Sequence, residues 1–264
     1  MAHTTGLVLA CVLGSAAMLA QEPAVEALQP AESPTVQAEP PETAISPKEL
    51  VKDVVHDQLR IFTFPVRAVH GKHWEPVLAI ALTTIGLVAL DPYTEPYFHD
   101  RSFDTYKTGA LRGRNSTAVI LGTAGAFYLV GLAKHSPHAQ NTGMLAAEAI
   151  IDSQILTFAI KQAVGRLTPS QIPPNGDYRD TWFKYKGSLT SGGSFPSGHA
   201  ASAFAVATVI AVRYRQHRWV PWVAYGAAAL IALSRLPDQA HFPSDIFFGS
   251  ALGFSISRFV VLAK

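Results

Sequence analysis

The stretch FPSGHAASAFAVATVIAV, at residues 195–212, decides the fold, because a polar helix start leads directly into an apolar helix. Pro196 suits the turn into a helix, and Ser197 is a favoured N-cap residue. The small residues at 200–203 permit close packing against neighbouring helices. The stretch therefore predicts an apolar helix that begins near Ser197 and packs tightly inside a helical bundle.

Five other apolar stretches accompany this one, and almost nothing in the sequence resembles a strand, so we expect an all-α, six-helix bundle. Most of the stretches are shorter than the roughly 20 residues of a comfortable bilayer span. A membrane-embedded bundle, which we expect, therefore competes with a compact helical domain in the periplasm. The third stretch contains Glu148 and Asp152, which either face the bundle interior near the site or pair with Arg and Lys. The six stretches are residues 76–90, 117–133, 144–164, 200–212, 219–233 and 246–262.

The composition favours a membrane setting or an anionic ligand. Only 15% of the residues are Asp, Glu, Lys or Arg, against about 25% in an ordinary soluble protein. The net charge of +2 hides an acidic segment at 1–47, which holds five Glu and no Lys or Arg. The rest of the chain carries 21 basic and 14 acidic groups, a net +7. No run of Lys or Arg indicates a nucleic-acid partner.

The N-terminal region predicts an exported chain. Residues 1–20 hold an apolar core that ends in small residues, which is typical of a secretory signal peptide or an uncleaved signal anchor. Cleavage would remove Cys11, the only cysteine, which suits an oxidising compartment. The Pro- and Glu-rich residues 21–47 predict a disordered linker, residues 48–72 an amphipathic helix and connector, and residues 73–264 the main domain.

Reactive side chains gather in three clusters near helix ends. Between His199 and Ser234 two apolar helices run out and back around a polar turn at 213–218, so these residues lie at the same end of the bundle. The loop at 170–195 joins the third apolar stretch to the fourth at that end. Cations gathered with two imidazoles suggest an anion that undergoes proton transfer or nucleophilic attack. The clusters are Lys161 with Arg166; Ser197, Gly198 and His199; and Ser234, Arg235, His241 and Asp245.

The second and third clusters each have a chemical and a structural interpretation. Free N–H groups at a helix start favour a phosphate near Ser197 and Gly198. Ser197 can equally be an ordinary N-cap beside an uninvolved His199. His241 and Asp245 stand four residues apart, so that in a helix the carboxylate would hold the imidazole in one tautomer. Asp245 can instead, or in addition, cap the last helix.

These clusters resemble the signature of the type 2 phosphatidic acid phosphatase and vanadium haloperoxidase superfamily, in its membrane-associated bacterial phosphatase branch. The signature reads KxxxxxxRP, PSGH and SRxxxxxHxxxD. Its second motif matches in full at 196–199 and its third at 234–245, and the resemblance spans about residues 75–262. It implies the six-helix fold of that superfamily and a metal-independent phosphoric ester hydrolase without a cofactor.

The resemblance also implies a two-step transfer through a phosphohistidine. His241, held by Asp245, would attack phosphorus, and His199 would protonate the leaving oxygen and later activate water. The matched residues Lys161, Ser197, Gly198 and Arg235 would bind and neutralise the phosphoryl oxygens. Arg166, which stands two residues before the motif position, would join them as a substitute.

The first motif departs from the family pattern. Thr168 stands before Pro169 where the motif has Arg, and threonine lacks the charged, bidentate fork of arginine. Either Arg166 substitutes for the missing residue, or the site holds phosphate with one cation fewer and its activity is impaired.

We expect a phosphatase that hydrolyses phosphate or diphosphate esters of lipids, phosphatidate-like or isoprenyl-diphosphate-like. A soluble periplasmic acid phosphatase of broad specificity, a vanadate-dependent haloperoxidase and an impaired phosphate-binding membrane protein are the alternatives. Aromatic and basic residues at 178–185 suit either a lipid headgroup or an ordinary interfacial belt.

The expected orientation rests on the three arginines of the turn at 213–218, which place this turn in the cytoplasm and the active end outside. Six spans in that orientation conflict with a cleaved signal, because the segment before residue 76 would then lie inside. We expect a cell-membrane protein whose site faces the periplasm, with a periplasmic protein as the alternative.

Overall fold

The computed structural model describes residues 42–264 except 71–73, 100–112, 174–175 and 185–192. Across these residues the regular structure is helical, so the all-α prediction is confirmed. The predicted signal at 1–20 and most of the predicted linker at 21–47 lie outside the described residues. The helices are α2 (Pro47–His70), α3 (Trp74–His99), α4 (Gly113–Ala133), α5 (Pro137–Val164), η2 (Pro169–Gln171), α6 (Gly198–Arg213), α7 (Trp219–Leu233), α8 (Pro243–Phe259) and η3 (Val261–Ala263).

Local signals in the sequence set where these helices begin and end. Helices α3 to α8 follow the six apolar stretches in order, and α2 follows the amphipathic segment. Ser136 caps α5, since its hydroxyl accepts from Ala139 N at 3.4 Å. Gly165 ends α5 in the left-handed conformation (φ 54°), which glycine adopts without a steric penalty.

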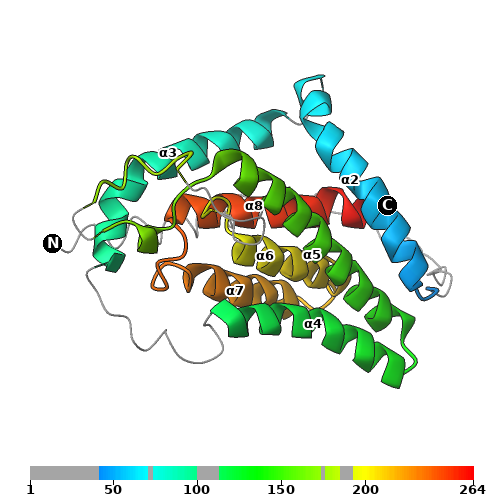
Figure 1. Cartoon of the computed structure of the whole chain (residues 1–264). Helices are drawn as coiled ribbons and strands as arrows, with labels where there is room; N and C mark the ends of the chain where they lie inside the picture. The colour runs from blue at the N-terminus through cyan, green and yellow to red at the C-terminus, as the bar shows by residue number, and fades with distance from the viewer. Residues whose placement is uncertain (1–41, 71–73, 100–112, 174–175, 185–192) are drawn as a thin grey trace, which may run out of the picture. The chain divides into compact units, whose positions relative to one another are not determined.

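Helix α6 forms the centre of the bundle and packs against α4, α5, α7 and α8 (Figure 1). Every residue at 200–209 except Phe204 is buried, and most of them are Ala or Val. Such small residues let the neighbouring helices approach closely. The predicted close packing around residues 200–203 is therefore present on all sides of α6.

The seam between α6 and α8 is the tightest contact of the bundle that the structure describes. A Cβ atom at Gly249 or Gly253 of α8 would overlap the carbonyl oxygen of Ser197 or Ala201 of α6. One turn further along, Ser257 donates its hydroxyl to the carbonyl of Ala205 at 3.1 Å. The two helices are thus in close contact over three successive turns, through backbone at Gly249 and Gly253 and through a side chain at Ser257.

The outer surface is that of a membrane protein. Helices α3, α4, α5 and α8 are long and apolar enough to cross a membrane, whereas α6 and α7 are shorter. Large apolar side chains are exposed on the outer helices, among them Ile85 of α3 and Trp222 of α7, at 65% and 77%. Because soluble monomers seldom expose contiguous apolar patches of this kind, the structure supports the membrane setting over the soluble one. Several helices are longer than the apolar stretches predicted from the sequence. Helix α3, for example, continues past residue 90 through a more polar segment that includes Pro92 and Pro96.

The residues immediately before α2 lie against the start of α5. Ile45 N donates to Asn141 Oδ1 at 2.7 Å, and Asn141 Nδ2 donates to Glu42 at 2.9 Å. Arg213, at the end of α6, donates to the same carboxylate at 2.6 Å. These contacts attach the entry to α2 to the end of the bundle opposite Lys161 and His199.

Candidate active site

The three clusters predicted from the sequence meet around the segment 193–197, which leads into α6. Lys161 Nζ donates to the carbonyl of Gly193 and lies 3.4 Å from that of Ser194. His241 Nδ1 lies 2.7 Å from the same Ser194 carbonyl. Ser197 N donates to the Asp245 carbonyl at 2.9 Å. Helix α5, the start of α6 and the start of α8 therefore share one short piece of backbone.

That piece of backbone is held by two close contacts. Ser194 N donates to the carbonyl of Arg166 at 2.7 Å, and a Cβ atom at Gly193 would overlap this same carbonyl. Ser197 caps α6, because its hydroxyl accepts from Ala200 N at 3.4 Å. The cap leaves the other N–H groups of the first turn available to an anion.

His241 is fixed in one tautomer by this backbone. A carbonyl oxygen only accepts hydrogen bonds, so the 2.7 Å contact to Ser194 places the proton on Nδ1 and leaves the lone pair on Nε2. Burial lowers the pKa of His241 below its ordinary value of 6.5, although the Asp245 carboxylate opposes the shift. His241 is therefore neutral at pH 7, the form in which Nε2 can act as a nucleophile.

Asp245 serves both of the purposes considered from the sequence. Its Oδ2 accepts from Phe242 N at 2.8 Å, which caps α8, and lies 3.8 Å from His241 Nδ1. That second distance is an electrostatic contact and not a hydrogen bond. His241 precedes α8 instead of lying on it, so its hydrogen-bond acceptor is a backbone carbonyl in place of the expected carboxylate.

Arg166 is buried and donates to protein groups on all sides, in what we call the Arg166 network (Asp91, Arg166, Ser244 and Asp245). Its NH1 donates to Asp245 at 2.6 Å and to Ser244 at 2.8 Å, and its NH2 donates to Asp91 at 2.7 Å. Its Nε donates to Thr181 at 3.2 Å. The guanidinium also lies between two aromatic rings, 4.3 Å from Trp182 and 3.9 Å from Phe242.

His199 and Arg235 lie on the side of the site that faces the start of α4. His199 Nε2 is 3.0 Å from both the Gly113 carbonyl and the Thr117 hydroxyl. Since the carbonyl only accepts, Nε2 carries the hydrogen and Nδ1 is left to exchange a proton. Arg235 is 1% exposed, and its NH1 lies 3.1 Å from Asp238. The charges of Arg235, Lys161 and His241 all act on His199, which places the four residues in one electrostatic environment.

Two other predicted residues lie at the margin of this arrangement. Gly198 is the first residue of α6, and its carbonyl accepts from Gln154 of α5 at 2.8 Å. Thr168 is half-buried and precedes η2; its hydroxyl is 3.0 Å from that of Ser170, and its N–H donates to Gln171 at 2.9 Å. Thr168 thus belongs to a local turn.

Sequence reasoning missed two carboxylates on α3. Asp91 accepts from Arg166, from the Ser244 hydroxyl and, at 3.2 Å, from Ser244 N. Glu95, one turn later, is fully buried, and neither of its carboxylate oxygens has a hydrogen-bond partner among the described residues. Two acidic residues four apart at the end of an apolar helix are the signal that could have revealed them.

A small cleft of about 240 Å³ opens between α3 and the loop that follows η2. Arg179 lies in it with its guanidinium 5.7 Å from the Tyr93 ring. Of the loop residues noted in the sequence, Tyr178 is buried, Phe183 is exposed, and Tyr185 lies outside the described residues. The lining residues are Val88, Ala89, Pro92, Tyr93, Arg166, Tyr178, Arg179 and Trp182.

Comparisons with known proteins match this part of the chain. A family profile described as the PAP2 superfamily matches residues 142–264. A lipid A 1-phosphatase of Rhizobium etli is 30% identical over 118 residues, which cover 44% of this chain and 48% of the relative. A lipid A 4′-phosphatase of Porphyromonas gingivalis is 28% identical over 118 residues, 45% of this chain and 48% of the relative. The matched region thus spans about half the length of these relatives.

A solved structure is also similar to the chain. It is a transmembrane PAP2-type phosphatidylglycerolphosphate phosphatase from Bacillus subtilis, with 18% identity and a TM-score of 0.40 over 80% of this chain and 94% of that one. All the motif residues described above fall within the segment that the family profile matches. Residues 142–264 are therefore similar to the PAP2 superfamily, both by the family profile and by their likeness to the lipid A phosphatases.

Proposed function

We propose that the chain is a phosphatase that hydrolyses phosphate esters of membrane lipids through a phosphohistidine on His241. The observation that carries the proposal is the tautomer of His241, whose Nδ1–H donates to the Ser194 carbonyl at 2.7 Å. The free lone pair on Nε2 is the electron pair that attack on phosphorus requires. The match of residues 142–264 to the PAP2 superfamily profile supports the same chemistry.

The first step forms a bond between His241 Nε2 and phosphorus and breaks the bond from phosphorus to the lipid oxygen. His199 acts in its imidazolium form, which the negative charge of a bound phosphate favours. It gives its Nδ1 proton to that oxygen, so the lipid leaves as an alcohol and His199 becomes neutral. In the second step His199 takes a proton from water as the water oxygen attacks phosphorus. The nitrogen–phosphorus bond then breaks, inorganic phosphate leaves, and His241 returns to its neutral form.

The phosphoryl oxygens carry negative charge in both steps, and preorganised donors would stabilise it. Lys161 and Arg235 are the cations assigned to this task, together with the Ser197 hydroxyl and the N–H of Gly198. Arg166 takes a different part, because four of its N–H groups already donate to Thr181, Ser244, Asp91 and Asp245. It would act on the reaction by holding Asp245, and therefore as a positioning residue.

The membrane surface of the fold supports a lipid as the source of the phosphate. The relatives named above act on lipid A at its 1 and 4′ positions, so a phosphorylated glycolipid joins phosphatidate-like and isoprenyl-diphosphate-like lipids as a candidate. The aromatic and cationic cleft between Tyr93 and Trp182 is suited to a headgroup near the interface. We further propose that the active end faces the periplasm, as the arginines at 213–218 suggest.

A substrate panel on the purified chain in detergent tests the proposal. Phosphatidate, phosphatidylglycerophosphate, an isoprenyl diphosphate and lipid A are compared with p-nitrophenyl phosphate, and released phosphate is measured. We expect at least one lipid to be hydrolysed faster than the soluble ester, and acid-labile label from a ³²P-labelled lipid to remain on the protein after rapid quenching. Preference for the soluble ester would overturn the lipid assignment, and absence of release from every substrate would overturn the enzyme assignment.

A further inference from the structure

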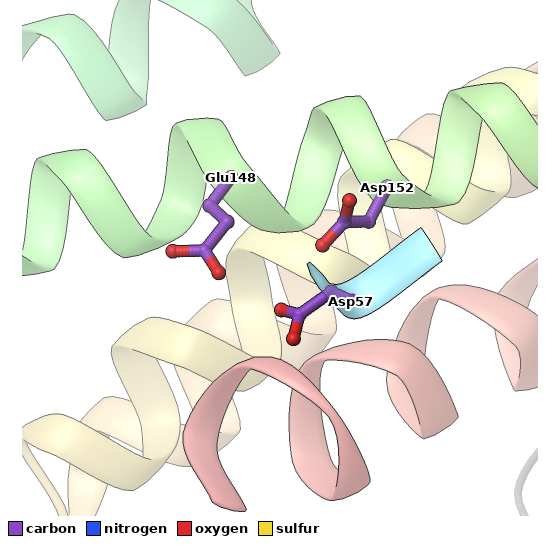
Figure 2. Close-up of side chains that lie close together, drawn as sticks. All are labelled: Asp57, Glu148 and Asp152. Atoms are coloured by element: carbon purple, nitrogen blue, oxygen red, sulfur yellow. The ribbon is translucent and has the colours of Figure 1, made fainter. Parts of the chain in front are cut away.

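Three carboxylates, distinct from the site of His199 and His241, converge in the interior of the bundle (Figure 2). Asp57 comes from α2, and Glu148 and Asp152 come from successive turns of α5, so that both point from one face of α5 toward α2. One oxygen of each lies within 4.8 Å of the others, and the residues are 0%, 1% and 0% exposed. We call these three residues the acidic cluster. Glu148 and Lys161 are 13 residues apart on α5, which corresponds to roughly 20 Å along the helix.

The protein supplies too little positive charge for these carboxylates. Lys264 Nζ contacts Glu148 and lies 2.9 Å from Asp57 Oδ2, and it also lies 3.5 Å from the more exposed Asp53. Arg60 and the exposed, titratable His56 lie further out, each 3.8 Å from Asp57 Oδ1. Asp152 receives one hydrogen bond from a neutral donor, Gln58 Nε2, at 2.8 Å. Three buried carboxylates therefore face two cations, and an uncompensated buried charge is strongly unfavourable.

Several oxygen atoms at the same place are also without a partner. Asp152 Oδ2 and Gln58 Oε1 are buried and have no hydrogen-bond partner among the described residues, and the same is true of Asp57 Oδ1. Buried acceptors are almost always satisfied in folded proteins. Since two of these atoms belong to fully buried aspartates of the cluster, an additional cation is the group that would satisfy them and neutralise the charge.

We propose that the acidic cluster binds one hard divalent cation, such as Mg²⁺, Mn²⁺ or Ca²⁺. The available ligands are all oxygens, from three carboxylates and the Gln58 amide, which is the donor set that these ions prefer. Ligands on opposite sides of such an ion lie roughly 4–5 Å apart, which agrees with the mutual distances of 4.8 Å or less.

Lys264 takes part in this proposal as a competitor. Its ammonium already contacts Glu148 and Asp57, so the ion has to displace it or share these carboxylates with it. Lys264 is 29% exposed on its side chain and can move toward solvent when the ion enters. The bound ion would join α2 to α5 and would take no part in the chemistry at His241.

Titration of the full-length, tag-free protein in detergent with MnCl₂, followed by electron paramagnetic resonance, tests the proposal after treatment with EDTA and dialysis. We expect one saturable Mn²⁺ per chain, displaced by CaCl₂ or MgCl₂. Asp152→Asn and Asp57→Asn should weaken binding at least tenfold, whereas Asp180→Asn, at an exposed carboxylate outside the cluster, should leave it unchanged. Lys264→Met should tighten binding several-fold, and a general disturbance of the fold would not have that effect.

Two results would overturn the proposal: no saturable binding by the parent at millimolar Mn²⁺, or equal binding by the parent and by both aspartate variants. His241→Ala serves to separate this proposal from the phosphatase assignment. That variant should bind Mn²⁺ with unchanged affinity whether or not the parent releases phosphate, and weakened binding in it would contradict a cation site independent of the histidines.

Discussion

The Arg166 network and the acidic cluster are both groups of buried charges, but only the first is completely paired. In the Arg166 network one guanidinium joins two carboxylates at 2.6 and 2.7 Å, and the Ser244 hydroxyl and N–H occupy further positions. In the acidic cluster three carboxylates share Lys264, and Asp152 Oδ2 has no partner in the part of the chain that the structure describes. The first group comes from α3, α8 and the segment after α5, and the second comes from α2 and α5, with Lys264 following η3.

The difference in charge pairing indicates a different role for each group. A fully satisfied buried network has one low-energy arrangement, so it can hold Asp245, and with it the start of α8, in a fixed position. An incompletely compensated group lowers its free energy by binding a ligand, a proton or water. The paired charges of the Arg166 network are therefore suited to positioning catalytic residues. The incompletely paired carboxylates of the acidic cluster are suited to binding a cation.

The largest effect on activity is expected from His241→Ala. This variant tests whether the phosphohistidine forms on His241, next to the Arg166 network. Loss of the nucleophile should lower phosphate release at least about 10³-fold, as removal of nucleophiles does in other enzymes that form covalent intermediates. Release of phosphate from the best lipid of the panel measures it. His217→Ala, at an exposed histidine of the opposite turn, is the matched control and should retain parental activity. A His241→Ala protein that is as active as this control would exclude the phosphohistidine.

Breaking each group at its cation compares them directly. Arg166→Met leaves Asp91 and Asp245 buried without a counter-charge and should cost about 3–5 kcal/mol of stability. With Mn²⁺ present, Lys264→Met should cost less than Arg166→Met, because Lys264 is partly exposed and its carboxylates can take up the added cation. Unfolding by denaturant in detergent gives both values. Equal losses would show that the two groups do not differ in pairing as described.

Thr168→Arg restores the residue that the family motif carries. Because Arg166 is already paired with Asp91 and Asp245, we expect an added cation near the phosphate to raise kcat/KM about tenfold, which corresponds to 1.4 kcal/mol of transition-state stabilisation. Ser170→Arg, which adds the same charge two residues away on an exposed position, should change kcat/KM little. If both variants behave alike, the effect is one of general charge and position 168 has no specific part.

The smallest effect concerns the pH dependence of kcat/KM. His241 must be neutral to attack, and burial holds its pKa below 6.5, so the acid limb of the profile should lie below pH 6.5. The Asp245 carboxylate favours the charged imidazolium and raises the pKa of His241. Asp245→Asn should therefore move the acid limb to lower pH, while a limb that moves to higher pH would contradict the assignment. The position of the limb, and not the height of the profile, is the measured quantity.

The helices could be predicted from the sequence because the apolar stretches are long and some of them are bounded by a recognisable cap or turn. Ser136 and Ser197 cap α5 and α6, and Gly165 ends α5. The length of the segment between His199 and Ser234 fits two antiparallel helices. It therefore correctly predicted that the three clusters lie at the same end of the bundle. These features depend on neighbours in the sequence, where periodicity and capping operate.

The partners of the buried charges could not be predicted in the same way. Arg166 pairs with Asp91, 75 residues earlier, and the sequence does not show which face of α3 meets α8. The apolar stretch predicted for this helix ended at residue 90, so Asp91 and Glu95 fell outside it, although α3 continues to His99. Asp57 could not be predicted because an amphipathic helix is expected to bury its apolar face. In the structure the polar face of α2, which carries Asp57, is the one that lies against α5.

The glycine seam has a consequence for how a substrate would arrive. With Gly249 and Gly253 against the carbonyls of Ser197 and Ala201, no space for an alkyl chain exists between α6 and α8. A lipid whose phosphate reaches His241 must therefore bring its tails in from another side of the bundle. The close packing of α6 against α8 thus restricts the directions from which a lipid can diffuse into the site within the plane of the membrane.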